Sequence, residues 1–160
     1  MRSFTGWIRK CMIGAVALGA ISASAAPVPW SSPRGTTPFF DYSNGQSDNG
    51  LFGSPSIAGT TFEFFPSSFK AESSNGSSAN TSDRLSFTLT AKPGQTIQGI
   101  TINEAGDYAI LGTGTVNAQG ALFVTNLDQF SFKSDPLHTN PTFPLGTTTA
   151  ASGIWTGSSQ

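Results

Sequence analysis

The chain has 160 residues, of which 11% are charged, 13 are phenylalanine, 18 are glycine and one is cysteine. Basic residues are few and scattered, which excludes nucleic-acid binding by neutralisation of phosphates. The aromatic content is too high for a chain that is disordered throughout. Threonine and phenylalanine favour strands, and glycine and asparagine favour turns, so the composition is typical of a β-protein.

The first 25 residues have the features of an export signal. An uncharged apolar run at 11–21 follows a basic, acid-free segment that contains Arg2, Arg9 and Lys10. As a helix this run would rise only about 16 Å, well short of the roughly 30 Å hydrocarbon core of a membrane. Ala23-Ser24-Ala25 then fits the small-residue pattern of a cleavage site. Residues 1–25 are therefore predicted to be a secretory signal peptide, cleaved after Ala25 or, as the second choice, after Ala26.

Cleavage would leave a mature chain of about 135 residues, which suits one domain. Cys11 lies at the start of the apolar run and not at the cleavage point, so lipidation is not expected, and the mature chain has no cysteine for a disulfide. Five basic residues face nine acidic ones after residue 25, a net charge of −4. We expect a secreted, extracellular or cell-surface protein with no transmembrane helix after cleavage.

The mature chain begins with a proline-rich segment at 26–38, which we interpret as an extended leader. A polar loop is expected at 41–53. Short strand patterns then follow one another, most clearly at 85–90, where Leu85, Phe87 and Leu89 alternate with polar residues. The other expected strands lie at 59–65, 69–73, 96–103, 107–116 and 121–127.

Turns are expected between these strands, including one at Glu104-Ala105-Gly106, and 121–127 is expected to pair with 107–116. The segment 128–152 has three prolines and little periodicity, so it is expected to be a long loop. Apolar Gly153 to Gly157 resembles a last strand. Short strands at this spacing, without a helical period, predict an antiparallel β-sandwich of jelly-roll or immunoglobulin-like type over residues 39–160.

One stretch carries a family resemblance. Ile100-Thr101-Ile102-Asn103-Glu104-Ala105-Gly106-Asp107-Tyr108, with its flanks, resembles a strand–Glu–x–Gly–Asp–Tyr–strand segment of secreted bacterial proteins of the PEP-CTERM, or exosortase-sorted, type. The likeness covers roughly residues 55–127. It implies a bacterial surface, matrix or biofilm-associated protein and no enzymatic activity. The Pro-Glu-Pro sorting tail of such proteins is not found here, so the expectation is either a fragment that lacks its last strands or a released protein.

A pair of carboxylates and a single histidine are the candidates for catalysis. Glu104 and Asp107 flank the expected turn, where a pair of carboxylates could perform acid–base chemistry if their environments differed. The alternative is that Asp107 caps the turn through backbone N–H groups. His138 is the sole histidine and falls in the expected loop, where a solvated side chain is the simpler interpretation than a catalytic triad.

Two further sets of residues could bind ligands. One polar stretch is a candidate calcium site, because its side chains carry the oxygen ligands that Ca²⁺ prefers: Asp41, Asn44, Asp48 and Asn49. Their spacing is not that of an EF-hand. Four aromatic side chains could stack on sugar rings: Trp30, Tyr42, Tyr108 and Trp155. The alternatives are leader contacts for Trp30 and core packing for Tyr108 and Trp155.

The sequence thus favours an exported, non-catalytic domain with a structural or interaction role at the cell surface or in the extracellular matrix. The alternative is a carbohydrate-binding module, assisted by Ca²⁺ or not. No other cofactor is indicated, and the expected partners are extracellular polysaccharide or matrix proteins.

Overall fold

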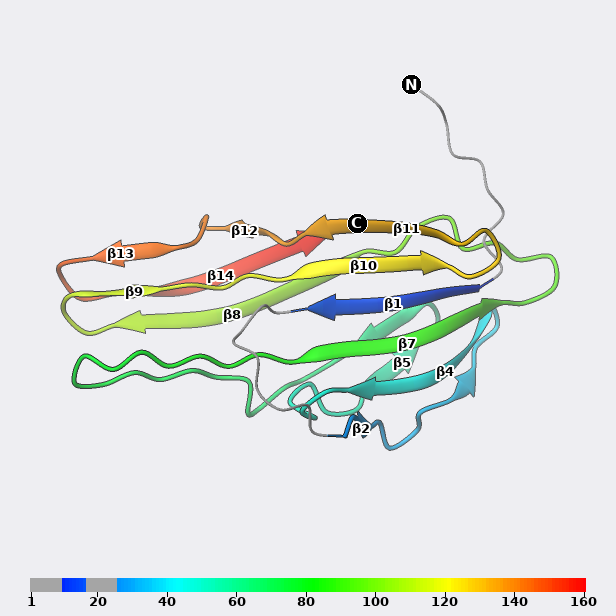
Figure 1. The fold of residues 1–160 in the computed structure, drawn as a ribbon, viewed down its shortest axis with the longest axis horizontal. Coiled ribbons are helices and arrows are strands. Elements are labelled where there is room, and N and C mark those ends of the chain that lie inside the picture. The colour runs from blue at the N-terminus through cyan, green and yellow to red at the C-terminus, as the bar shows by residue number, and fades with distance from the viewer. Residues whose placement is uncertain (1–9, 17–25) are drawn as a thin grey trace, which may run out of the picture.

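The structure, a computed structural model, describes residues 10–16 and 26–160. Within these residues the protein is all-β, without a helix, and its strands form several antiparallel sheets in a sandwich-like arrangement (Figure 1). The predicted fold class is confirmed. None of the described segments is a helix long and apolar enough to cross a membrane.

The largest sheet has seven strands. Its order is β11 (Ser131–Pro136), β10 (Ala121–Asn126), β1 (Lys10–Val16), β7 (Arg84–Ala91), β4 (Phe40–Ser47) and β2 (Val28–Pro29), with β3 (Gly35–Thr36) also paired to β4. In Figure 1 the blue strand β1 lies between yellow β10 and green β7.

The other strands of the described residues form three smaller sheets. One contains β12 (His138–Asn140), β14 (Ala151–Ser159) and β8 (Ile102–Ile110), and the others pair β13 (Leu145–Thr147) with β9 (Gly114–Val116) and β5 (Ser56–Ala58) with β6 (Thr61–Glu63). In Figure 1, β9 and β10 follow one another along the molecule, and β11, β12 and β13 return beside them.

The core lies against one face of the largest sheet, because β7 alternates apolar and polar residues. Leu85, Phe87 and Leu89 are buried, as predicted. Phe62 of β6 covers this face from the second layer, with its ring centroid 4.9 Å from that of Phe87. The remaining buried members of the cluster are Trp30, Phe40, Tyr42 and Leu122, and Ile100 and Ile102 pack against it as expected.

The segment 26–38, expected to be an extended leader, is part of the largest sheet. Its strands β2 and β3 pair with β4, and Trp30 is only 3% exposed. The Trp30 ring lies where a Cβ on Gly45 would be, so the glycine makes room for the indole. Trp30 is therefore part of the core and not merely a leader contact.

The expected turn at Glu104-Ala105-Gly106 is also wrong, because β8 runs without interruption from Ile102 to Ile110. Gly106 stands opposite Trp155 of β14, and a Cβ there would lie 2.5 Å from the indole nitrogen. The glycine thus permits close approach of an aromatic ring within a strand, a role that sequence pattern does not separate from a turn.

Other boundaries differ too. The expected strand at 69–73 is not formed, 59–65 becomes a β5–β6 hairpin, and most of 96–103 lies outside β8. The expected loop 128–152 contains β11, β12 and β13, with Pro136 at the end of edge strand β11, where a missing N–H costs least. Strand β10 pairs with β1 and β11, not with 107–116. The last strand, β14, pairs with β8 and β12.

The expected signal peptide is described in part. Lys10–Val16 forms strand β1, while residues 1–9 and 17–25, including the predicted cleavage motif Ala23-Ser24-Ala25, lie outside the described residues.

Candidate functional site

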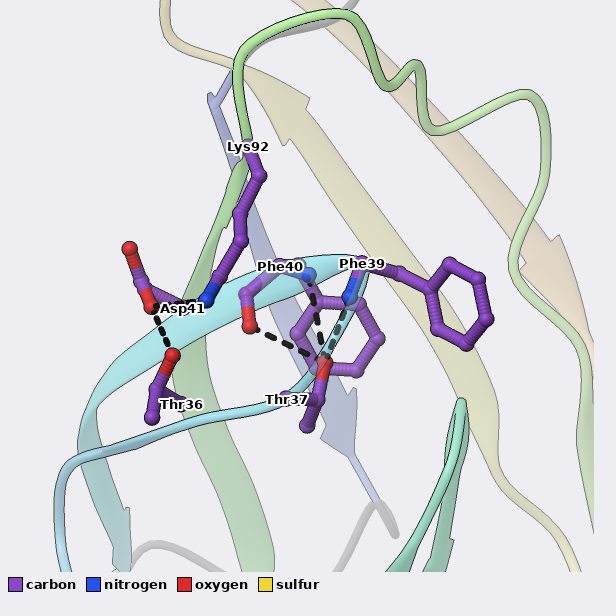
Figure 2. A network of polar contacts seen from close by, with 6 residues as sticks. All are labelled: Thr36, Thr37, Phe39, Phe40, Asp41 and Lys92. Atoms are coloured by element: carbon purple, nitrogen blue, oxygen red, sulfur yellow. Dashed lines mark hydrogen bonds and ion pairs between the residues drawn. The ribbon is translucent and has the colours of Figure 1, made fainter.

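Asp41, the first of the expected calcium ligands, is already engaged within the protein. Figure 2 shows its carboxylate between two side chains: the Thr36 hydroxyl donates a hydrogen bond of 2.6 Å to Oδ1, and Lys92 Nζ lies 3.8 Å from the same oxygen. Beside it, the Thr37 hydroxyl accepts from the backbone N–H groups of Phe39 and Phe40. This network ties the β3–β4 turn to the end of β7.

The four expected calcium ligands do not converge. Of the stretch predicted to be a polar loop, 41–47 belongs to strand β4, which ends at Ser47, and only 48–53 lies outside a strand. A strand advances about 3.3 Å per residue, so Asp41 and Asp48 lie on the order of 20 Å apart. Asn44 sits in a bulge of β4 with a φ of 57°, and the Asn49 side chain donates to the Ser82 carbonyl. Among the described residues no group of three or more His, Cys, Asp or Glu could hold a metal ion.

Sequence reasoning missed Asp83, the most thoroughly bonded carboxylate of this region. Its side chain is buried, 3% exposed, directly before β7. Oδ1 accepts from the backbone N–H groups of Asn49 and Arg84, each at 2.8 Å, and Oδ2 accepts from that of Leu51 at 2.7 Å. Asp83 therefore fixes the 48–53 turn against β7. A single aspartate before a strand gives no periodic signal, so only the fold exposes this role.

Glu104 and Asp107 do not form a carboxylate pair. Three residues apart in one strand, they point to opposite faces of the sheet. Glu104 is half-buried opposite Gly157, and burial raises the pKa of its carboxyl. Asp107 is exposed opposite Ile154. The two carboxylates have distinct environments, but they cannot act on one bond.

Two of the expected sugar-stacking residues lie close together. Tyr108 and Trp155 share the half-buried face of the β8–β14 pair, and Phe143, which sequence analysis did not single out, packs edge-on against both rings at 6.1 and 5.9 Å. Tyr42 lies elsewhere, in the buried core. Each ring of the pair also faces a glycine: Gly106 opposite Trp155 and Gly153 opposite Tyr108. The core-packing interpretation of Tyr108 and Trp155 fits this geometry better than an open platform does.

His138 lies beside a carboxylate. It begins β12 with an exposed side chain, and its Nε2 lies 3.7 Å from Asp135 Oδ1. The Ser159 hydroxyl donates to Asp135, at 2.9 Å from the backbone oxygen and 3.0 Å from Oδ2, and not to the imidazole. A nucleophile needs its base within hydrogen-bond reach, and this serine has a carboxylate instead.

The Asp135 cluster instead fastens the end of β14 to β11. The backbone N–H of Gln160 donates to Asp135 Oδ2 at 3.0 Å. This bond and that from Ser159 lower the pKa of the Asp135 carboxyl, since they stabilise its charged form, and His138 adds a smaller contribution. A shallow hollow beside it is lined by Thr101, Lys133, Asp135, His138, Ser158, Ser159 and Gln160.

Comparison with protein-family models, with curated proteins and with solved structures finds no match. The fold and the geometry of its polar clusters are therefore the basis for a functional assignment.

Proposed function

We propose that this is an exported, non-catalytic protein with a structural or interaction role at the cell surface or in the extracellular matrix. The proposal rests on the hydrogen bonds of the carboxylates. Asp41, Asp83 and Asp135 each hold two segments of the chain together through hydrogen bonds. Glu104, the acid whose pKa burial raises, points away from Asp107. These contacts fit a scaffold better than an acid–base site.

The outer face of the largest sheet supports an interaction role. On β7, Ser86 and Thr88 lie between the buried residues and Thr90 follows the last of them, and β4 places Ser43 opposite Thr88. Such a face offers hydroxyl groups, and its Asp41 is paired with Lys92, so it can form hydrogen bonds to polysaccharide or protein without strong electrostatic selection. The resemblance to PEP-CTERM proteins at residues 100–108 points to the same setting, a bacterial surface or biofilm matrix.

Fractionation of a producing culture tests this proposal. The protein is expected outside the cytoplasm, in the matrix, surface or medium fraction, and its sequenced N-terminus is expected at Ala26 or Pro27. Replacing both Ala25 and Ala26 with leucine should block cleavage, because small residues are needed at the site, whereas Ser24→Leu should leave cleavage after Ala25 intact. Extracytoplasmic protein that retains Met1 would refute the export signal.

A carbohydrate-binding function is the second candidate, and one observation favours a particular place for it. Phe123 of β10 and Phe132 of β11 stack with ring centroids 5.8 Å apart and an interplanar angle of 23°. Phe132 is 63% exposed, and the outward neighbours Thr125 and Ser134 are polar. A flat, partly exposed ring beside hydroxyl groups can stack on a sugar, unlike the edge-packed Tyr108 and Trp155.

Retention on immobilised polysaccharides tests this second candidate. Phe132→Ala should abolish retention, and the control Phe65→Ala, at a ring that is 81% exposed outside the strands, should not. Equal retention of the two variants would show that Phe132 does not bind sugar.

A further inference from the structure

Strand β1 occupies an interior position in the largest sheet. It pairs with β7 over seven residues, from Lys10 opposite Thr90 to Val16 opposite Arg84. On its other side it pairs with β10 over five residues, from Cys11 opposite Asn126 to Ala15 opposite Leu122. Since β7 otherwise pairs with β4, and β10 with β11, β1 joins the two halves of the sheet (Figure 1).

The same residues lie within the predicted signal peptide. Cleavage after Ala25 would remove 10–16 and leave β7 and β10 facing an empty strand position. Their N–H and C=O groups on that side would lose their partners, in the middle of a sheet and not at its edge. The buried row of β7, with Leu85, Phe87 and Leu89, would lose its neighbour on one side, as would Leu122 of β10.

We infer that the mature protein accepts, in the position between β7 and β10, a β-strand donated by a different polypeptide. This inference rests on the proposed export and cleavage. The donor is an extended segment of about seven residues that runs antiparallel to both neighbours. Backbone hydrogen bonds to two flanking strands supply its affinity, and its alternate side chains supply the specificity.

The register defines the chemistry of the donor. Positions 11, 13 and 15 of β1 stand opposite Leu89, Phe87 and Leu85 of β7, which are buried in the core. Because alternate residues of a strand share a face, the donor needs apolar residues at these three positions. The intervening positions 12 and 14 stand opposite Thr88 and Ser86, on the outer face, where polar residues are acceptable.

A second copy of the chain has no suitable strand to spare. Among residues 26–160 the longest segments outside the strands are 64–83 and 92–101. Neither contains three apolar residues at successive alternate positions: in the first, Ser67 separates Phe65 from Phe69 and Ser73 follows Ala71, and in the second, Ile97 and Ile100 do not share a face. The strands that do show this alternation, such as β7, already belong to the sheet. A different exported polypeptide is therefore the donor that the pattern favours.

A peptide with the sequence of residues 10–16, carrying Cys11→Ala to remove the thiol, is the probe. It should bind the mature chain 26–160 and raise its thermal midpoint, and it should not bind the full chain, whose position is filled. Two variant peptides provide the control. Met12→Lys changes an outward position and should bind comparably, whereas Ile13→Lys places a charge opposite Phe87 and should bind at least about 100-fold more weakly.

Each outcome decides the inference. If chain 26–160 fails to fold alone, refolding with the probe peptide, but not with Ile13→Lys, should restore a cooperative melt. A mature chain as stable as the full chain, with no peptide binding in either preparation, would overturn the inference. A stable dimer of 26–160 that the peptide disperses would identify a second copy as the occupant and overturn the heterologous donor.

Failure of the export proposal gives a different result. Peptide binding to 26–160 together with an intact Met1 on the exported protein would refute cleavage, and with it the empty position in the natural protein. Cleavage at Ala26 or Pro27 without peptide binding would refute the strand-accepting position alone.

Discussion

In the largest sheet, β7 presents three large apolar side chains to a second layer that contains Phe62, whereas in the β8–β14 pair the inward positions alternate aromatic rings with glycine. The first arrangement fills a core with bulky side chains on both sides. The second lets a ring on one strand lie over the bare backbone of its neighbour, as Trp155 does at Gly106 and Tyr108 at Gly153. The β8–β14 pair thus gains contacts between aromatic rings and the neighbouring backbone, although it has no core of bulky side chains like that beside β7.

The largest expected effect is in the core of the large sheet. Phe87→Ala should lower the free energy of unfolding by about 3–5 kcal/mol, because it removes a buried ring that packs against Phe62 and Trp30. The control Phe65→Ala, at an exposed ring, should change it by less than about 0.5 kcal/mol. Chemical denaturation measures both, and a loss below about 1 kcal/mol for Phe87→Ala would show that this face is not the core.

In the β8–β14 pair, glycine is the sensitive residue. Gly106→Val should cost about 1–3 kcal/mol, since a branched side chain would collide with the Trp155 indole. Gly99→Ala is the matched control, because no atom lies within 4 Å of the position of its Cβ. Combining Gly106→Val with Trp155→Ala should recover part of the loss, and strictly additive losses would mean that the ring and the glycine do not interact.

The polar contacts are expected to have a comparable or smaller effect. Asp83→Asn should destabilise the protein by about 1–3 kcal/mol, because an amide offers a single acceptor oxygen in place of a carboxylate bonded to three backbone N–H groups. Asp107→Asn, at an exposed position, should leave stability and any ligand binding unchanged. Selective loss of binding in Asp107→Asn would instead assign this carboxylate a function.

The smallest effects concern pH, and the two shifted carboxyls act in opposite directions. Burial raises the pKa of Glu104, so the folded protein holds the carboxyl proton more tightly than the unfolded chain does. The protonated Glu104 therefore stabilises the folded state relative to its ionised form, and this stabilisation is lost as pH rises from the unfolded pKa through the folded pKa. Hydrogen bonds lower the pKa of Asp135. The ionised carboxylate therefore stabilises the folded state at pH values above the unfolded pKa, and this stabilisation is lost as pH falls through the folded pKa.

Denaturant midpoints of single variants, measured between about pH 3 and about pH 7, separate the two. Glu104→Gln should gain stability relative to the native protein at the upper end, and Asp135→Asn should lose stability there. A loss of stability near neutral pH in Glu104→Gln would show that the charged form of Glu104 has a favourable partner.

The two regions also differ in how far the sequence predicted them. Strand β7 and its buried face followed from the alternation of Leu85, Phe87 and Leu89, since one side of that strand faces the core and the other does not. Strand β8 was split by an expected turn, because Gly106 carries the same signal whether it serves a turn or a ring. Strands β11 to β13 have few large inward side chains, so their pairing depends on neighbours distant in the sequence.

The candidate sites were less predictable than the fold. Tyr108 and Trp155 were identified from their chemistry, but their edge-on packing against Phe143 depends on the chain between β12 and β13. Asp41 and Asp48 were assigned to one loop, and only the pairing of β4 with β7 reveals that a strand separates them. The role of Lys10–Val16 as a sheet strand was masked by its stronger resemblance to the apolar run of an export signal.

Hydrogen exchange on the backbone amides of β7 compares the full chain with the mature chain 26–160 most directly. Amides of β7 that point toward β4 should be protected in both chains. Those that point toward β1 should be protected in the full chain and exchange rapidly in 26–160, with protection regained when the peptide of residues 10–16 is added. Equal protection of the two sets in the mature chain without peptide would show that β7 and β10 close on each other, and that no strand is missing between them.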